Sequence, residues 1–110
     1  MISIQIPSFV EKELLEATTY YDTQSSGLGD DFAREVQRLL DRLSIFPTSA
    51  PRLGEAFRLC PLQRFPYSLL YEVESELLVI VGLIHQKQGP ETCEEKLKRA
   101  SSAYVRKASP

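Results

Sequence analysis

The sequence has no tryptophan, a single histidine and only two cysteines among its 110 residues. Because Cys60 and Cys93 lie far apart and only His85 is left to join them, the chain lacks the ligand set of a structural zinc ion. It contains no glycine-rich phosphate loop and no Gly-x-Ser-x-Gly motif, so we expect no bound cofactor. Without an export signal, the two cysteines are expected to be free thiols.

Long hydrophobic runs and an excess of positive charge are also missing. The longest apolar run, Leu77 to Ile84, is much shorter than the about 20 residues of a membrane-spanning helix. The first residues contain neither a basic segment nor a long apolar one, which argues against a secretory signal and predicts a cytoplasmic protein. Thirteen Lys and Arg against fifteen Asp and Glu give a net charge of -2, which argues against a strongly basic nucleic-acid binder.

Length and composition indicate one globular domain over residues 1–110, since 43% of the residues are hydrophobic and 25% are charged. Apolar periodicity predicts the elements of this domain in the following order. They are a strand with Ile2, Ile4 and Ile6 on one face, helices from Ser8 to Tyr21 and from Leu28 to Phe46, strands Phe57–Cys60, Arg64–Glu74 and Leu77–Ile84, and a helix from Thr92 to Tyr104. Ser8 and Glu11 match a capping box, and Pro47 ends the second helix.

This order predicts an α+β fold in two layers. An N-terminal strand and an antiparallel helix hairpin accompany a three-stranded antiparallel meander, and an extra helix follows at the C-terminus. The core is expected over residues 1–90, and the C-terminal helical extension over residues 91–107. We expect Leu77–Ile84 to be a central strand covered on both faces, because its run of apolar residues is nearly continuous.

Several short motifs then carry a resemblance to a known family. They are Glu16–Tyr21, Gly27–Phe32, Phe46-Pro47 and Arg58–Val73, followed by His85. In their order and spacing, over roughly residues 1–90, the chain resembles the RelE/ParE family of bacterial toxins from type II toxin–antitoxin modules. It looks closer to the ParE, or plasmid stabilisation, side of that family, chiefly through its Tyr-Tyr and Phe-Pro-Tyr segments. The fold of the family agrees with the predicted order of elements.

The resemblance implies a growth-inhibiting toxin that a cognate antitoxin neutralises, as a homodimer or a toxin–antitoxin heterotetramer. ParE-like members act on DNA gyrase and are not known as nucleases, so the first hypothesis is a non-enzymatic inhibitor of gyrase. RelE-like members cut messenger RNA on the ribosome, and an endoribonuclease of this kind is the alternative, which leaves open whether the chain is an enzyme. A third hypothesis is a decayed toxin that only binds its antitoxin, because the basic loop of the family is reduced here to Lys87.

In the nuclease hypothesis, Arg64, His85 and Arg58 carry the catalysis. Arg58 and Arg64, on or beside neighbouring strands, are expected to form a cationic patch that holds phosphate. His85 at the end of its strand is expected to transfer a proton. The alternatives are ion pairs between the two arginines and neighbouring glutamates, and a hydrogen bond between His85 and the backbone.

Lys87 and Tyr71 are the expected contacts with a target or with phosphate. Lys87 stands where many family members have arginine, and a solvated loop residue is its alternative interpretation. Tyr71 alternates with Tyr67 along one strand, so both rings face the same side. Stacking on a base is one interpretation, and packing against the helix hairpin is the favoured one.

Charge is distributed unevenly along the chain. Residues 1–47 hold eight acidic and four basic residues, whereas residues 96–107 hold five cations and no anion. The basic segment suits nucleic acid or an acidic antitoxin, and a solvated helix face is the alternative.

Overall fold

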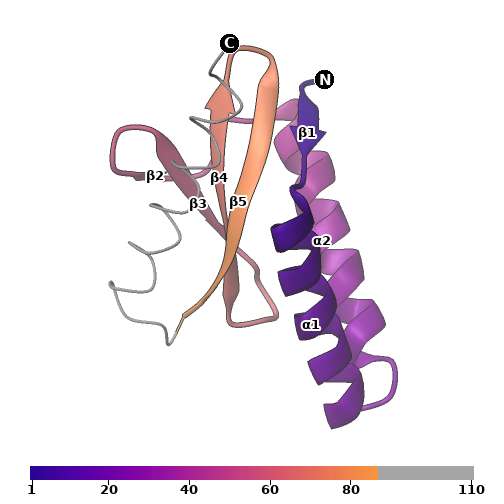
Figure 1. The fold of residues 1–110 in the computed structure, drawn as a ribbon. Helices are drawn as coiled ribbons and strands as arrows, with labels where there is room; N and C mark the ends of the chain where they lie inside the picture. The colour runs from indigo at the N-terminus through magenta and orange to yellow at the C-terminus, as the bar shows by residue number, and fades with distance from the viewer. Residues whose placement is uncertain (87–110) are drawn as a thin grey trace.

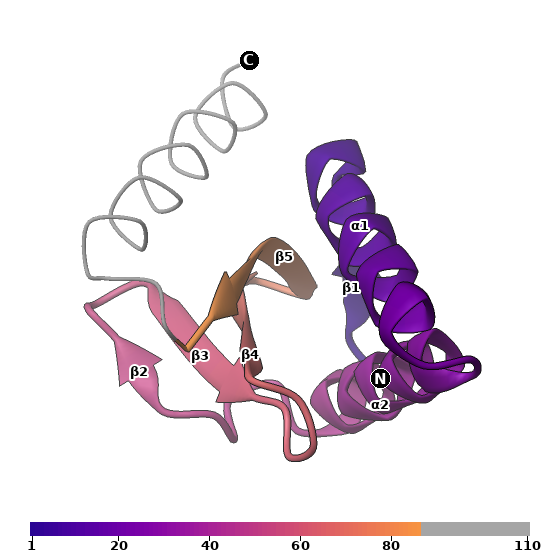
Figure 2. The same ribbon diagram turned by 90° about the horizontal axis from the view of Figure 1, so that it is seen from below.

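A computed structural model describes residues 1–86 of the chain. Within this part, two long helices lie side by side and cover one face of a twisted sheet (Figures 1 and 2). Helices α1 (Ser8–Gln24) and α2 (Leu28–Ile45) are joined by a short turn, which confirms the predicted hairpin. The helix predicted from Thr92 to Tyr104 lies outside the described residues, as do Lys87 and Cys93.

The start of α1 differs from the predicted capping box. Pro7 is the residue that precedes the helix, no side chain caps it, and the amide of Glu11 donates to the carbonyl of Pro7 at 3.0 Å. Ser8 already belongs to the first turn of the helix. A capping side chain has to come from the residue before that turn, so the capping-box prediction for Ser8 and Glu11 is wrong.

Gly29 allows the two helices to approach closely near the hairpin turn. A Cβ atom at this position would lie 2.5 Å from the carbonyl oxygen of Thr18 and 2.6 Å from the carboxylate of Asp22. The amide of Gly29 donates to Oδ1 of Asp22 at 2.8 Å. Asp22 therefore caps α2 from the last turn of α1, where Gly27, at φ 87°, offers no side chain of its own.

The described residues form one sheet of five strands in the order β1-β5-β4-β3-β2. The strands are β1 (Ser3–Gln5), β2 (Arg52–Leu53), β3 (Phe57–Pro61), β4 (Tyr67–Glu74) and β5 (Leu77–His85). The predicted meander is confirmed as β3, β4 and β5, which pair antiparallel in sequence order. β1 joins it by parallel pairing with β5, and this pairing makes the sheet mixed.

Two boundaries of the sheet differ from the sequence-based expectation. Arg52–Leu53, which is not among the predicted strands, forms the edge strand β2 against β3. A strand of two residues is too short to show periodicity in the sequence. β4 begins at Tyr67 rather than at Arg64. The amide of Leu62 donates to the carbonyl of Tyr67 at 2.8 Å, which closes the β3–β4 turn just before β4 begins.

Strand β5 lies between β1 and β4, and every residue from Leu78 to Ile84 is buried. The prediction of a central strand is confirmed, and a cover over its second face stays a prediction. Its register with β4 shifts at one point, where Leu70 pairs with Gly82 and Tyr71 pairs with Ile80. Val81 is therefore bulged, and the shift reverses the alternation of side chains along the rest of β5.

The two faces of the sheet consequently carry separate apolar clusters. The near face, toward the helices, belongs to the main core, which also holds Val10, Phe32, Leu43, Leu69, Tyr71, Leu78, Ile80 and Leu83. The far face carries a second cluster of buried side chains, Leu70, Val79, Val81 and Ile84, flanked by the partly buried Leu53, Phe57, Leu59 and Leu77. We refer to these eight residues as the far-face cluster.

The close helix contact at Gly29 leads to the first prediction. In an unobstructed helix, replacing glycine by alanine gains about 1 kcal/mol of stability. Gly29→Ala is expected instead to lower the free energy of unfolding by about 1–3 kcal/mol, because the new methyl group meets the backbone of α1. Urea denaturation measures the change, and Ala33→Gly at an exposed site of α2 calibrates the propensity effect. A Gly29→Ala variant more stable than the parent chain would contradict the close contact.

Candidate functional site

A cavity of about 450 Å³ opens between α1 and the adjoining ends of β4 and β5. It is lined by Glu13, Glu16, Ala17 and Tyr20 of α1 and by Tyr67, Leu83 and His85 of the two strands. Two carboxylates and three aromatic side chains thus share one concave surface. Such a surface favours a cationic or aromatic side chain of a protein partner, and its carboxylates repel the phosphates of a nucleic acid. We call it the acidic cavity.

His85 ends β5 as predicted and lies in the acidic cavity. It is paired in register with Tyr67 of β4, and the two rings meet edge to face with their centroids 4.9 Å apart. Burial raises the pKa of Tyr67, and the neighbouring Tyr20 phenol raises it further, so Tyr67 stays neutral at physiological pH. Proton transfer by His85 stays a prediction.

The turn between β3 and β4 is held by Glu35, a residue that sequence reasoning missed. Its Oε2 atom accepts the amide of Gln63 at 2.6 Å and that of Arg64 at 3.2 Å. The side chain projects from α2 into the protein, with only 8% of the residue exposed. A glutamate one helical turn from Phe32 and beside Val36, within an apolar stripe, is the signal in the sequence that points to such a buried role.

Arg64 is placed by this turn and not by a strand. Its Nη2 atom lies 3.6 Å from Oδ2 of Asp31, and its guanidinium carbon lies 5.8 Å from the ring centroid of Phe65. The ion pair with Asp31 replaces the ion pair with a sheet glutamate that was the alternative interpretation. Because both side chains of the pair are substantially exposed, the pair orients Arg64 and contributes little to stability.

Arg58 and Tyr71 hold the loop that follows α2. The Nη1 atom of Arg58 donates to the carbonyls of Thr48 at 3.0 Å and of Ala50 at 2.7 Å. The hydroxyl of Tyr71 donates to the carbonyl of Pro47 at 2.7 Å, and the residue is fully buried. The core interpretation of Tyr71 is confirmed. The ring and the hydroxyl of Tyr71 are thus occupied inside the protein, and a contact between Tyr71 and a target stays a prediction.

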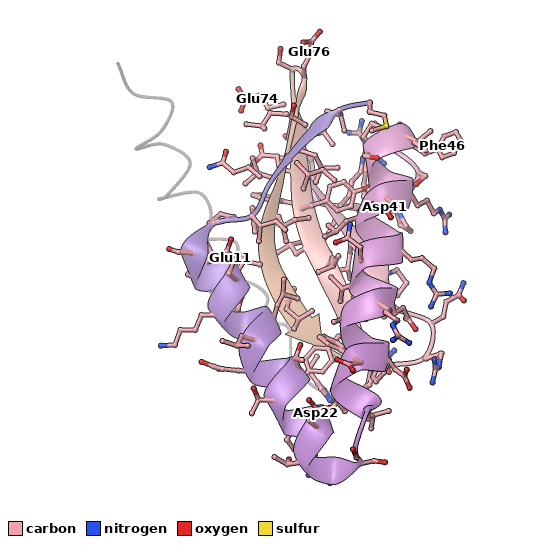
Figure 3. The ribbon with its side chains drawn as sticks, turned by 90° about the vertical axis from the view of Figure 1, so that its right-hand side faces the viewer. Glu11, Asp22, Asp41, Phe46, Glu74 and Glu76 are labelled. Carbon is pink, nitrogen blue, oxygen red and sulfur yellow. The ribbon has the colours of Figure 1, made fainter. Side chains whose placement is uncertain are left out.

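The predicted cationic patch of Arg58 and Arg64 is not formed. The guanidinium of Arg64 lies at Asp31 in the first turn of α2, whereas that of Arg58 lies at the loop beyond the end of α2. A helix of 18 residues is about 27 Å long. Figure 3 shows the two ends of this helix, with Asp22 beside the start of α2 and Phe46 at its end. The two cations therefore do not converge on one phosphate.

The described part of the chain has neither a metal-binding cluster nor a helix suited to a membrane. Among residues 1–86, no three His, Cys, Asp or Glu side chains are grouped closely enough to hold a metal ion. No helix of these residues is both long and apolar enough to cross a membrane. Lys87, the remaining predicted contact, lies outside the described residues, and its role stays a prediction.

Glu35 gives a direct test of how the β3–β4 turn is held. Glu35→Ala removes the acceptor of two partly buried amides and is expected to lower the free energy of unfolding by about 1–3 kcal/mol. Arg34→Ala, at the exposed neighbour on the same helix, is expected to change it by no more than about 0.5 kcal/mol. Urea denaturation compares the two variants. Equal effects would show that Glu35 does not hold the turn.

Because Tyr71 is buried, we expect the free energy of unfolding to fall in alkaline solution. Burial raises the pKa of Tyr71 above the ordinary tyrosine value of 10.0. The unfolded state therefore loses this proton first as the pH rises through about 10, and the free energy of unfolding falls between the unfolded and the folded pKa. Tyr71→Phe is expected to reduce that slope, while Tyr20→Phe, at a 55% exposed residue, serves as the control. Urea unfolding from pH 8 to 11 measures it, and an unchanged slope in Tyr71→Phe would contradict the assignment.

The fold of this chain is also found in a protein of known structure. A solved structure, the chromosomal ParDE TA system from P. aeruginosa, is similar to this chain with a TM-score of 0.58 and 15% sequence identity. The match covers 77% of this chain and 96% of that chain, and at such low identity it shows a shared fold. No curated protein matches the sequence.

A family model gives the more specific result. The model of the ParE toxin of the type II toxin–antitoxin system parDE matches residues 7–90. This range includes both helices and the whole meander, and with them the acidic cavity and the loop after α2 that Arg58 and Tyr71 hold. Since the match spans well over half of the sequence, the chain belongs to the family of ParE toxins of type II toxin–antitoxin systems.

Proposed function

We propose that this chain halts bacterial growth by inhibiting a protein target, DNA gyrase, and that a cognate antitoxin neutralises it. Family membership makes the chain a ParE toxin. The proposal adds two points to this membership, namely the identity of the target and neutralisation by an antitoxin. Catalysis on RNA by a RelE-like site is the competing function, and it makes different demands on the same residues.

The positions of the charged groups distinguish between these two functions. RNA cleavage needs a proton-transfer group next to cations that stabilise the extra negative charge on phosphate. His85 instead shares its cavity with Glu13 and Glu16. The guanidiniums of Arg58 and Arg64 are bound at the two ends of α2. This arrangement supports recognition of a protein surface over transition-state stabilisation of a phosphodiester.

A protein partner also agrees with the chemistry of the acidic cavity. Carboxylates beside the rings of Tyr20 and Tyr67 favour a lysine or arginine side chain, through both charge and cation–π attraction. The helix hairpin around the cavity carries an excess of acidic residues, eight against four basic ones over residues 1–47. A partner that meets this layer is therefore expected to present basic residues.

The decisive experiment is a supercoiling assay with purified gyrase and relaxed plasmid. The folded chain is expected to inhibit supercoiling at micromolar concentration. The His85→Gln variant is expected to inhibit to within about twofold of the parent chain, since a protein contact of this size changes affinity less than the loss of a catalytic group. Expression of the chain alone is expected to arrest growth, and co-expression with the neighbouring open reading frame is expected to relieve the arrest.

Two results would overturn the proposal. If translated messages are cut, as seen by primer extension, and the cleavage disappears in His85→Gln and in Arg64→Ala, the chain is a ribosome-dependent nuclease. If the folded chain neither arrests growth nor inhibits gyrase, it is a decayed toxin. Affinity for the product of the neighbouring reading frame would then identify it as an antitoxin-binding protein.

A further inference from the structure

The far-face cluster is an apolar surface on the side of the sheet away from both helices. Leu70 is 0%, Val81 2%, Val79 6% and Ile84 8% exposed. Within residues 1–86, both helices lie on the other side of the sheet (Figure 2), so no described helix or strand forms a layer over this face. An apolar surface of this kind needs a cover, because leaving it in water loses the free energy that its burial contributes.

The remaining 24 residues of the chain provide a segment of matching pattern and position. They begin directly after Gln86, which follows the end of β5, and β5 itself supplies four residues of the far-face cluster. In this segment Cys93, Leu97, Ala100 and Tyr104 recur at steps of four, three and four, which predicts a narrow apolar stripe on a helix. Most of the segment lies beyond the family match, which ends at residue 90.

We propose that residues 92–104 form an amphipathic helix that docks its apolar stripe on the far-face cluster of the same chain. The proposal makes the C-terminal extension a third layer of this protein, so that the sheet is covered on both faces. It does not depend on the identity of the toxin's target.

Charge on the far face agrees with this occupant. Glu72 and Glu74 alternate with Leu70 along β4 and therefore share its face. Figure 3 shows Glu74 and Glu76 together at the hairpin end of β4 and β5. The segment from residue 96 to 107 carries five cations and no anion, so it complements these carboxylates. Burial, followed by the charge of Glu74, raises the pKa of Glu72.

The two native cysteines allow a test on the full chain. Cys60 is buried on the near face and reports unfolding of the core, whereas Cys93 belongs to the docking stripe. Their rates of reaction with a thiol reagent are measured in the purified protein, with cleavage and mass spectrometry to separate the two sites. Both thiols are expected to react at least about tenfold more slowly than in urea, because reaction requires local opening.

Two matched substitutions then separate docking from general folding. Leu97→Asp places a charge on the stripe and is expected to speed the reaction of Cys93 at least about tenfold while Cys60 stays slow. Ser102→Asp adds the same charge about 140° around the predicted helix and is expected to leave both rates unchanged. If Leu97→Asp exposes both thiols, the milder Leu97→Ser decides, and the same selective release of Cys93 is expected there.

Three outcomes would overturn the proposal. Cys93 in the parent chain would react as fast as in urea, or its rate would not respond to substitution of Leu97. Alternatively, its protection would depend on protein concentration, and light scattering would show a dimer, which would make a second copy of the chain the occupant of the far face.

Discussion

Burial of strand β5 on both of its faces is the constraint around which the described part of the protein is arranged. A strand without a polar face needs hydrogen-bonding partners along both edges and apolar cover above and below. β4 and β1 supply the edges, and the helix hairpin covers the near face. β1 lies at the edge of the sheet beside β5. The two helices and the first strands of the meander separate β1 from β5 in the sequence, and β5, the last strand, runs parallel to β1.

Polar side chains secure the loops around this core from inside. Glu35 binds the β3–β4 turn, Arg58 and Tyr71 bind the loop after α2, and Asp22 binds the start of α2. Each satisfies backbone groups that would otherwise lose their water without a partner. These contacts use two of the four described residues that were expected to act on a target or on RNA.

The order of helices and strands was predictable because apolar periodicity in this chain is strong. The stripe of α2, the alternation in β4 and the continuous run in β5 each indicate an element by themselves. Short or strained features were not predictable. The strand β2 has two residues, the bulge at Val81 leaves no trace in composition, and the true start of α1 depends on one dihedral angle at Pro7.

The candidate site was predictable only in part. The position of His85 at a strand end follows from the extent of the apolar run before it. Its neighbours Glu13, Glu16 and Tyr20 come from α1, more than sixty residues earlier, and no local pattern connects them to it. In the same way, the sequence indicates that Arg58 and Arg64 are near each other along the chain. Only the turn and the length of α2 show that their charged groups are far apart.

The amino-acid sequence by itself therefore determined which segments form helices and strands, the two-layer arrangement and the resemblance to ParE toxins. These follow from local periodicity, from turn residues and from motifs whose spacing lies along the chain. The tertiary structure alone decided which side chains meet. A guanidinium or carboxylate binds whatever acceptor or donor the packed backbone brings within about 3 Å, and that partner is set by the fold as a whole.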